Sequence, residues 1–157
     1  MTLSLRPEAE ADEPFLRRLI IGAISQELGA EYWPEAMRGR LLDMQYSARR
    51  LPLRDRYPDG QSSIVLLDGA EAGWIFVASL PGELRLVEIL ILPEHRGKGA
   101  GNALIRRLIA DAGGRPVRLS VDARNTRAIR LYERLGFRAA GGDEVHLLME
   151  HPAGGAC

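Results

Sequence analysis

A basic, glycine-rich stretch at residues 95–108, HRGKGAGNALIRRL, combines residue types that suit anion binding. It follows an apolar segment that ends at Pro93 and runs into a helical pattern. The first N–H groups of a helix lack partners within the helix, and the helix dipole adds about half a positive charge there. Glycines allow the backbone to approach a ligand closely. The stretch predicts a phosphate site to which Arg96 and Lys98 add charge, with a plain solvated turn as the alternative.

Two other phosphate-binding patterns fit this stretch less well. A P-loop needs Ser or Thr directly after its lysine, and here Gly99 follows Lys98. A dinucleotide-binding G-x-G-x-x-G motif needs a third glycine where the chain has Leu104. Asp122 does stand roughly where an acid that binds a ribose is expected. A Rossmann-like dinucleotide binder therefore stays open as the rival interpretation.

A second motif lies at residues 125–137, NTRAIRLYERLGF. Asn125 is a residue type preferred at the start of a helix, because its side chain can accept a hydrogen bond from a free N–H group. Tyr132 follows seven residues, or about two turns, later, so the two residues share a helix face. Gly136 would end this helix and Phe137 would begin a strand.

The periodicity of apolar residues predicts the elements that position these motifs. The order begins with a strand and two helices, continues with hairpins, and ends with strand–helix–strand units. This order indicates an α/β fold with a mixed sheet and helices on both faces. Residues 22–34 and 52–60 are expected to be irregular. The predicted helices cover residues 11–21, 34–50, 99–112 and 125–135, and the predicted strands cover residues 3–6, 62–67, 72–79, 84–92, 116–121, 137–140 and 144–150.

Composition narrows the class of protein. The chain of 157 residues is long enough for one domain, which we expect at residues 1–150 with a flexible tail at 151–157. Its 21 basic and 21 acidic residues balance, which argues against a nucleic-acid partner. No membrane-spanning segment or signal peptide is recognisable, so a cytoplasmic location is expected. The one cysteine, Cys157, argues against disulfides, cysteine-rich metal sites and a catalytic thiol.

Together, the two motifs resemble the signatures of the GNAT superfamily of acyl-CoA-dependent N-acetyltransferases. The run from Arg96 to Gly101 fits the pattern [RQ]-x-x-G-x-[GA] after an apolar strand that ends in Leu-Pro. The spacing Asn125-x-x-Ala128-x-x-x-Tyr132-x-x-x-Gly-Phe resembles the second signature. The resemblance covers residues 60–150 well and residues 1–59 only by element order. It implies a GNAT-like, mostly antiparallel sheet of six to seven strands.

The resemblance also implies acetyl-CoA as co-substrate, without a metal. The glycine turn would hold the pyrophosphate, and a bulge would open a gap between strands 84–92 and 116–121 for the pantetheine arm. Asn125 would hydrogen-bond the arm, and Tyr132 would protonate the departing thiolate. The residues implied in cofactor binding besides these two are Leu90, Ile91, Leu92, Arg96, Gly97, Lys98, Gly99, Ala100, Gly101 and Asn102.

The base and the acceptor site are less well marked. Glu88 is a carboxylate in an otherwise apolar run, so it must be paired or its pKa must rise. It is a candidate general base, with an ordered water as the alternative base and a structural role as the other reading. Gln45, Tyr46 and Tyr57 are candidates for an acceptor pocket, or else belong to a solvated helix face and loop.

The implied activity is acetyl transfer from acetyl-CoA to a primary amine of a small molecule or peptide, by direct attack in a ternary complex. A non-catalytic acyl-CoA-binding domain is the alternative within the same resemblance. The protein is expected to be a monomer or a homodimer.

Overall fold

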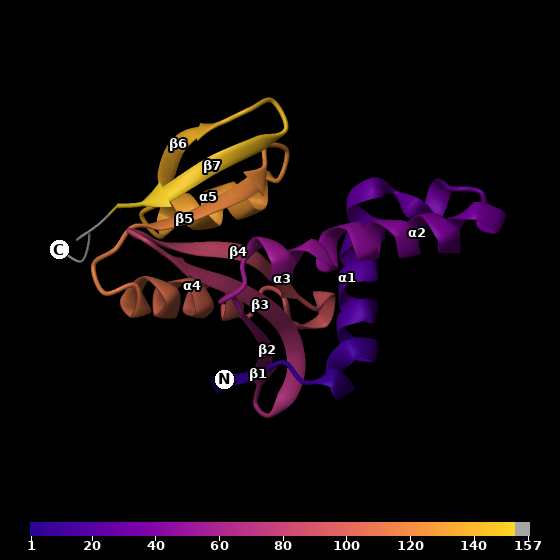
Figure 1. Ribbon diagram of the computed structural model, residues 1–157, viewed down its shortest axis with the longest axis horizontal. Helices are drawn as coiled ribbons and strands as arrows, with labels where there is room; N and C mark the ends of the chain where they lie inside the picture. The colour runs from indigo at the N-terminus through magenta and orange to yellow at the C-terminus, as the bar shows by residue number, and fades with distance from the viewer. Residues whose placement is uncertain (153–157) are drawn as a thin grey trace.

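A computed structural model describes residues 1–152 of the chain. Its strands are β1 (Leu3–Pro7), β2 (Gln61–Leu67), β3 (Ala70–Leu80), β4 (Glu83–Ile91), β5 (Val117–Asp122), β6 (Arg138–Gly142) and β7 (His146–His151). They form one sheet in the order β1-β2-β3-β4-β5-β7-β6 (Figure 1). Every neighbouring pair is antiparallel except β4 and β5, which are parallel. The predicted mixed, mostly antiparallel sheet is therefore confirmed.

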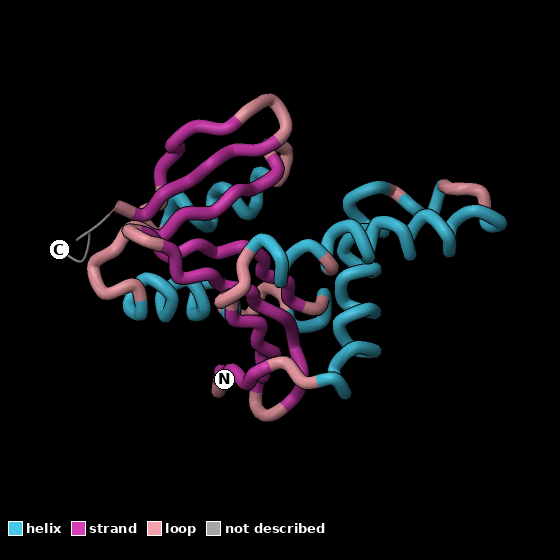
Figure 2. The backbone as a smooth tube through the Cα atoms, viewed as in Figure 1, coloured by secondary structure: helices cyan, strands magenta, loops and turns pink. Residues whose placement is uncertain are grey.

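The helices are α1 (Glu13–Leu28), α2 (Glu35–Arg50), α3 (Pro52–Arg56), α4 (Ala100–Asp111) and α5 (Thr126–Arg134). Short 3-10 turns lie at η1 (Glu10–Asp12), η2 (Ala30–Tyr32) and η3 (Pro93–His95). Figure 2 shows how far α2 projects from the sheet. Within residues 1–152, none of these helices combines the length and the apolar character that crossing a membrane requires.

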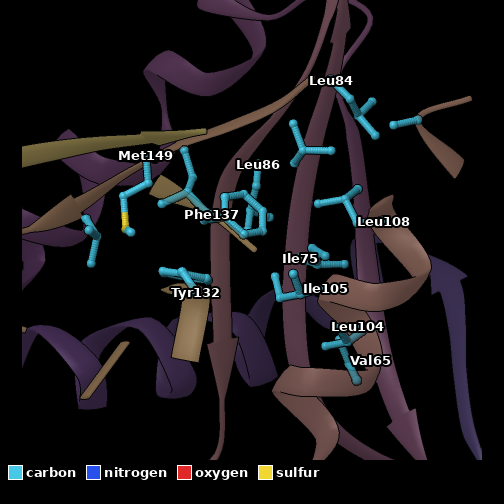
Figure 3. Packing of buried hydrophobic residues seen from close by; sticks show 14 residues of the cluster. Val65, Ile75, Leu84, Leu86, Leu104, Ile105, Leu108, Tyr132, Phe137 and Met149 are labelled. Atoms are coloured by element: carbon cyan, nitrogen blue, oxygen red, sulfur yellow. The ribbon is translucent and has the colours of Figure 1, made fainter. Parts of the chain in front are cut away.

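Helices cover both faces of the sheet, as the sequence predicts. On one face, Leu104 of α4 and Tyr132 of α5 share a buried cluster with Ile75 of β3 (Figure 3). On the other face, Leu16 of α1 packs in a second cluster with Trp74 of β3. Successive side chains of a strand point to opposite faces, so β3 contributes to both clusters.

Strand β4 contains an extra residue. Phe76 of β3 lies opposite Glu88, whereas the next residue, Val77, lies opposite Leu86. Val87 therefore has no partner of its own in this register, which defines a β-bulge. The bulge that the GNAT resemblance implies is thus present in the strand where it was expected.

The bulge changes which residues of β4 face each helix layer. Before it, Leu84 and Leu86 are buried in the cluster beneath α4. After it, Ile89 and Ile91 pack against that same cluster, so the alternation has shifted by one residue. Glu88 is thereby placed on the opposite face, toward α1 and α2.

The pairing of β4 with β5 is short. It joins only Leu84–Leu86 to Val117–Leu119. Beyond these residues, β4 continues to Ile91, while β5 continues to Asp122 paired with β7 on its other side. The described parts of β4 and β5 therefore separate toward their C-terminal ends and leave a gap between them.

The first helix is longer than the sequence suggests. The predicted helix ends at residue 21, but α1 continues to Leu28. Gly22 costs helix propensity without breaking the helix, and a Cβ added there would meet nothing within 4 Å. Ile24, which is 3% exposed, packs in the core and holds the extension in place. Gly29, with φ at 62°, then ends α1.

Two further segments differ from the prediction. The expected loop after residue 51 contains α3, because Pro52 suits a first helical turn and Leu53 is buried. The predicted flexible tail begins at His151, but His151 is the last residue of β7 and its ring lies 5.5 Å from that of Phe137. Residues 153–157, including Cys157, lie outside the described part of the chain.

An ion pair fixes the entry to α1. Both Arg6 terminal nitrogens donate to the Asp12 carboxylate at 2.7 Å, and Ala9 N–H donates to it at 2.8 Å. Chiefly through the Arg6 hydrogen bond, the pKa of Asp12 falls from 3.8 to about 2, although burial opposes the shift. A lowered carboxyl pKa stabilises the fold above its unfolded-state pKa, and this stabilisation is lost as pH falls toward 2.

Asp12→Asn is therefore expected to lower the free energy of unfolding by on the order of 2 kcal/mol at neutral pH. The difference from wild type should shrink between about pH 4 and pH 2, because Asp12 becomes protonated there. Urea unfolding across this range measures both effects. Asp55→Asn, at an exposed position on α3, is the control and should change little. A pH-independent difference for Asp12→Asn would show that its charge is not responsible.

Candidate active site

The gap between β4 and β5 exposes main-chain groups of β4. Leu92 N–H donates to Ala72 O at 2.8 Å, toward β3. Because successive residues of a strand direct their main-chain groups to opposite sides, the N–H and C=O of Ile91 and Ile89 point into the gap. Of the predicted Leu90, Ile91 and Leu92, only Ile91 therefore has this orientation. Ile89 has the same orientation but could not be found from the sequence, because the register depends on the position of the bulge.

The glycine turn borders the gap at the start of α4. Gly97 and Gly99 have φ values of 76° and 82°, which favour glycine, and a Cβ added to either would meet nothing within 4 Å. Gly99 is the N-cap of α4, and its lack of a side chain leaves the first N–H groups of the helix uncapped. Ala100 is buried, whereas Gly101 and Asn102 are half-buried. The turn therefore offers open space beside free N–H donors, as an anion site requires.

The two charged residues of the turn differ in their contacts. Arg96 Nε donates to Ile91 O at 2.9 Å, and Arg96 Nη1 reaches Gln26 Oε1 at 3.4 Å. Its guanidinium thus holds the end of β4 and occupies the Ile91 carbonyl, which the resemblance assigns to the pantetheine arm. Lys98 is exposed. Both Arg96 acceptors are neutral, so both residues leave their positive charge available at the turn.

Helix α5 brings Tyr132 to the gap. The middle of α5 packs close to the start of α4, since a Cβ on Gly101 would lie 3.6 Å from Leu131. Tyr132 is 7% exposed, and its ring centroid lies 5.6 Å from that of Phe137 (Figure 3). Asn125 is exposed and caps α5, its Oδ1 accepting from Ala128 N–H at 3.2 Å. Its amide nitrogen is the part that a ligand could still use.

The Tyr132 hydroxyl has an unusual environment. Burial, and secondly the negative charge of Glu88, raise the pKa of Tyr132 from 10.0 to about 12. The charge of Glu88 thus acts on the Tyr132 hydroxyl although Glu88 contacts Arg49 of α2 and Tyr132 packs in the cluster beneath α4. The hydroxyl is therefore held protonated at neutral pH.

Glu88 is held by Arg49 of α2, a partner that the sequence did not predict. Its carboxylate accepts from Arg49 Nε at 3.0 Å and from Arg49 Nη2 at 2.9 Å, and Glu27 lies 3.6 Å from Arg49 Nη1. Burial lowers the pKa of Arg49, but the hydrogen bonds and charge of Glu88 more than offset this and raise it overall. The apolar strand around Glu88 predicts a cationic partner, but not which of the chain's 20 arginines provides it.

A cavity of about 280 Å³ adjoins this ion pair between α1 and α2. Among the three predicted acceptor residues, Gln45 lines it. Tyr46 is instead 6% exposed in the core and donates its hydroxyl to Glu13, while Tyr57 packs its ring 6.2 Å from that of Phe76. The lining residues are Ile24, Glu27, Leu28, Gln45, Ala48 and Arg49.

Comparison with known proteins agrees with this geometry. Residues 25–137, more than half of the chain, match the family described as the acetyltransferase (GNAT) family. A mycothiol acetyltransferase from Nocardiopsis dassonvillei is 34% identical over 91 residues, which cover 57% of this chain and 28% of that protein. A mycothiol acetyltransferase from Corynebacterium efficiens is 38% identical over 92 residues, which cover 55% of this chain and 30% of that protein. The chain thus spans less than a third of the length of these two relatives.

The fold also has counterparts among solved structures. The crystal structure of the PaiA N-acetyltransferase from Thermoplasma acidophilum in complex with coenzyme A superposes with a TM-score of 0.72. The match covers 97% of this chain and 99% of that one, at 18% sequence identity. At this identity, the likeness shows the fold alone. With the glycine turn, the β4 bulge, the opened β4–β5 pair and the match over residues 25–137, the chain belongs to the acetyltransferase (GNAT) family.

Proposed function

We propose that the protein transfers an acetyl group from acetyl-CoA to a primary amine of a small molecule or peptide, by direct attack in a ternary complex. The observation that supports this proposal is the opened β4–β5 pair beside the uncapped start of α4, with Glu88 in β4 close enough for its charge to act on Tyr132 of α5. A carboxylate and a protonated phenol are the proton acceptor and donor that such a transfer needs.

The residues at the gap fit acetyl-CoA. Free N–H groups at the start of α4 and the exposed Lys98 suit the pyrophosphate, and the open space at Gly97 and Gly99 leaves room for it. The unpaired ends of β4 and β5 leave main-chain donors and acceptors for the pantetheine arm, with Ile89 the clearest of them. When bound, acetyl-CoA would supply an acetyl thioester.

Glu88 is suited to take a proton from the acceptor amine. A primary amine has a pKa near 10 and is mostly protonated at neutral pH, so it must lose a proton before it can attack. The bidentate contact with Arg49 orients the Glu88 carboxylate. The Ile89 N–H, pointing into the gap next to it, is placed to donate to a developing oxyanion.

Tyr132 is suited to return a proton to the leaving thiolate. With its pKa raised to about 12, the hydroxyl keeps its proton at neutral pH. The charge of Glu88 is one of the two causes of this shift. When Glu88 takes up the amine proton, that charge is neutralised and Tyr132 becomes a stronger acid. The two proton transfers are thereby coupled in the order that the reaction needs.

The cavity between α1 and α2 supports a small cationic acceptor. Its volume of about 280 Å³ is just below the range of about 300 to 1,000 Å³ that is usual for drug-sized ligands. Glu27, Arg49 and Glu88 together carry one net negative charge, which favours an ammonium group over an anion. An amine that enters here approaches Glu88 from the α1–α2 side.

Incubation of the protein with acetyl-CoA and a library of primary amines, read by mass spectrometry, tests the activity and the role of Tyr132 together. Wild type should form acetylated amine, and Tyr132→Phe should turn over on the order of 100-fold more slowly while binding acetyl-CoA about equally. Phenylalanine preserves the packing against Phe137, and Tyr57→Phe is the matched control. Binding of acetyl-CoA without product formation would favour the acyl-CoA-binding alternative. Equal turnover in Tyr132→Phe would exclude Tyr132 as the acid.

Gly99→Ala tests the pyrophosphate site. The new methyl group would project into the open space at the turn, so the affinity for CoA in calorimetry should fall about tenfold or more. Gly113→Ala is the control at the other end of α4, where φ is 62° and the space is equally open. It should incur similar backbone strain without changing CoA affinity. Equal losses of affinity in both variants would point to general destabilisation instead.

Glu88→Gln tests the base. The kcat/KM for the amine should fall on the order of 100-fold at neutral pH, where the acceptor must be deprotonated. The deficit should shrink as pH approaches the amine pKa of about 10, since free amine no longer needs a base. A pH–rate profile of both proteins measures this. A deficit of constant size across the profile would assign Glu88 a structural role and leave the base to an ordered water.

A further inference from the structure

We infer that a groove beneath the C-terminal half of α4, apart from the candidate active site, binds a free amino acid with an apolar side chain. This α4 groove has a volume of about 270 Å³ and lies between α4 and the sheet. Its floor on the sheet includes Leu5, Val77 and Leu84 beside the polar Ser63, and its rim includes Asp59, Arg107, Asp111 and Arg115. The volume suits a ligand smaller than a typical drug.

The groove lies at the opposite end of α4 from the glycine turn. The 12-residue helix spans about 18 Å, and Asp111 is its last residue. Leu84 lies near the start of β4, whereas Ile89 and Ile91 of the gap lie near its end. A ligand in the α4 groove would therefore not occupy the space proposed for acetyl-CoA.

The floor leaves apolar surface open in the middle of the sheet. Val77 is only half-buried, although β3 is an interior strand covered by α4 on this face. Leu5 of the edge strand β1 is also half-buried. Removing such surface from water is favourable by roughly 25 cal/mol per Å². An aliphatic side chain placed on this floor would gain that free energy.

Arg115 provides a fixed positive charge at the rim. Its Nε donates to Ala112 O at 2.9 Å, and its Nη1 donates to Ser79 Oγ at 2.7 Å. These two contacts hold the guanidinium over the groove and leave Nη2 free to donate. Half-buried Arg49 and Arg118 contact carboxylates, whereas Arg115, like Arg38, makes no ion pair within residues 1–152. The carboxylate of a ligand would supply the missing counter-charge.

The acidic residues of the rim could bind the ammonium group of an amino acid. Asp111 and Asp59 are exposed carboxylates that, within residues 1–152, are likewise without an ion-pair partner. The rim therefore offers both signs of charge around an apolar floor, with Arg107 balancing the second acid. A zwitterion with an aliphatic side chain matches the positive rim charge, the negative rim charge and the apolar floor. A simple anion or a simple amine with the same side chain matches the floor and only one of the two charges.

The test is a titration of the ¹⁵N-labelled protein, without acetyl-CoA, with L-leucine followed by NMR. Saturable shifts at millimolar concentrations are expected at residues 77–79 and 108–115. 4-Methylpentanoate, which lacks the ammonium, and isopentylamine, which lacks the carboxylate, should each bind at least about tenfold more weakly. Arg115→Gln should weaken L-leucine binding about tenfold. Arg106→Gln, on the same helix but bonded to Asn102 at 2.7 Å, is the matched control and should bind as wild type does.

Several results would overturn the inference. The absence of saturable shifts would do so, as would equal binding of the two analogues. Shifts confined to the α1–α2 cavity would show leucine acting as an acceptor amine instead. Wild-type affinity in Arg115→Gln would also reject it. Because the wild-type titration needs no substitution and no acetyl-CoA, its outcome does not depend on the proposed acetyl transfer or on the folding of a variant.

Discussion

The bulge at Val87 determines which face of the sheet the Glu88 side chain lies on and which way the main-chain groups of Ile89 point. In a regular strand, Glu88 would share the face of Leu84 and Leu86, and its carboxylate would be buried in the apolar cluster beneath α4. An unpaired charge in such a place is strongly unfavourable. The extra residue turns Glu88 to the α1–α2 face, and it also directs the main-chain groups of Ile89 toward β5. One insertion in the register thus positions a carboxylate on one side of the sheet and opens a row of free donors along its edge.

The helical layer over this face completes the arrangement. Arg49, near the end of α2, reaches Glu88 on β4, so the ion pair ties a projecting helix to the centre of the sheet. The same helix carries Arg50, whose Nη2 contacts Glu8 at 2.5 Å and whose guanidinium lies 5.5 Å from the Trp74 ring. Two neighbouring arginines therefore fix α2 through half-buried acids, Glu88 in β4 and Glu8 just after β1. The cavity between α1 and α2 depends on this fixation, because all of its lining residues come from these two helices.

Local patterns in the sequence predicted much of this fold. The order of strands and helices, the glycine turn and the Asn125 cap follow from short-range signals and were found as expected. The extension of α1 past Gly22 was not predicted, because burial of Ile24 outweighs the glycine's low helix propensity. The pairing of Glu88 with Arg49 joins residues 39 positions apart, and no periodicity encodes such a contact. Tyr46 resembled a pocket residue by position, yet its ring fills the core between helices.

The short ladder between β4 and β5 has a consequence for how the protein holds together. Three residues on each strand join β1–β4 to β5–β7, so within the sheet the two halves meet along a narrow seam. A molecule inserted into the gap beyond that seam contacts both halves and acts as a bridging element of the sheet. By mass action, its binding free energy is added to the stability of the folded state. The cellular concentration of such a ligand would then influence the lifetime of the protein as well as its turnover rate.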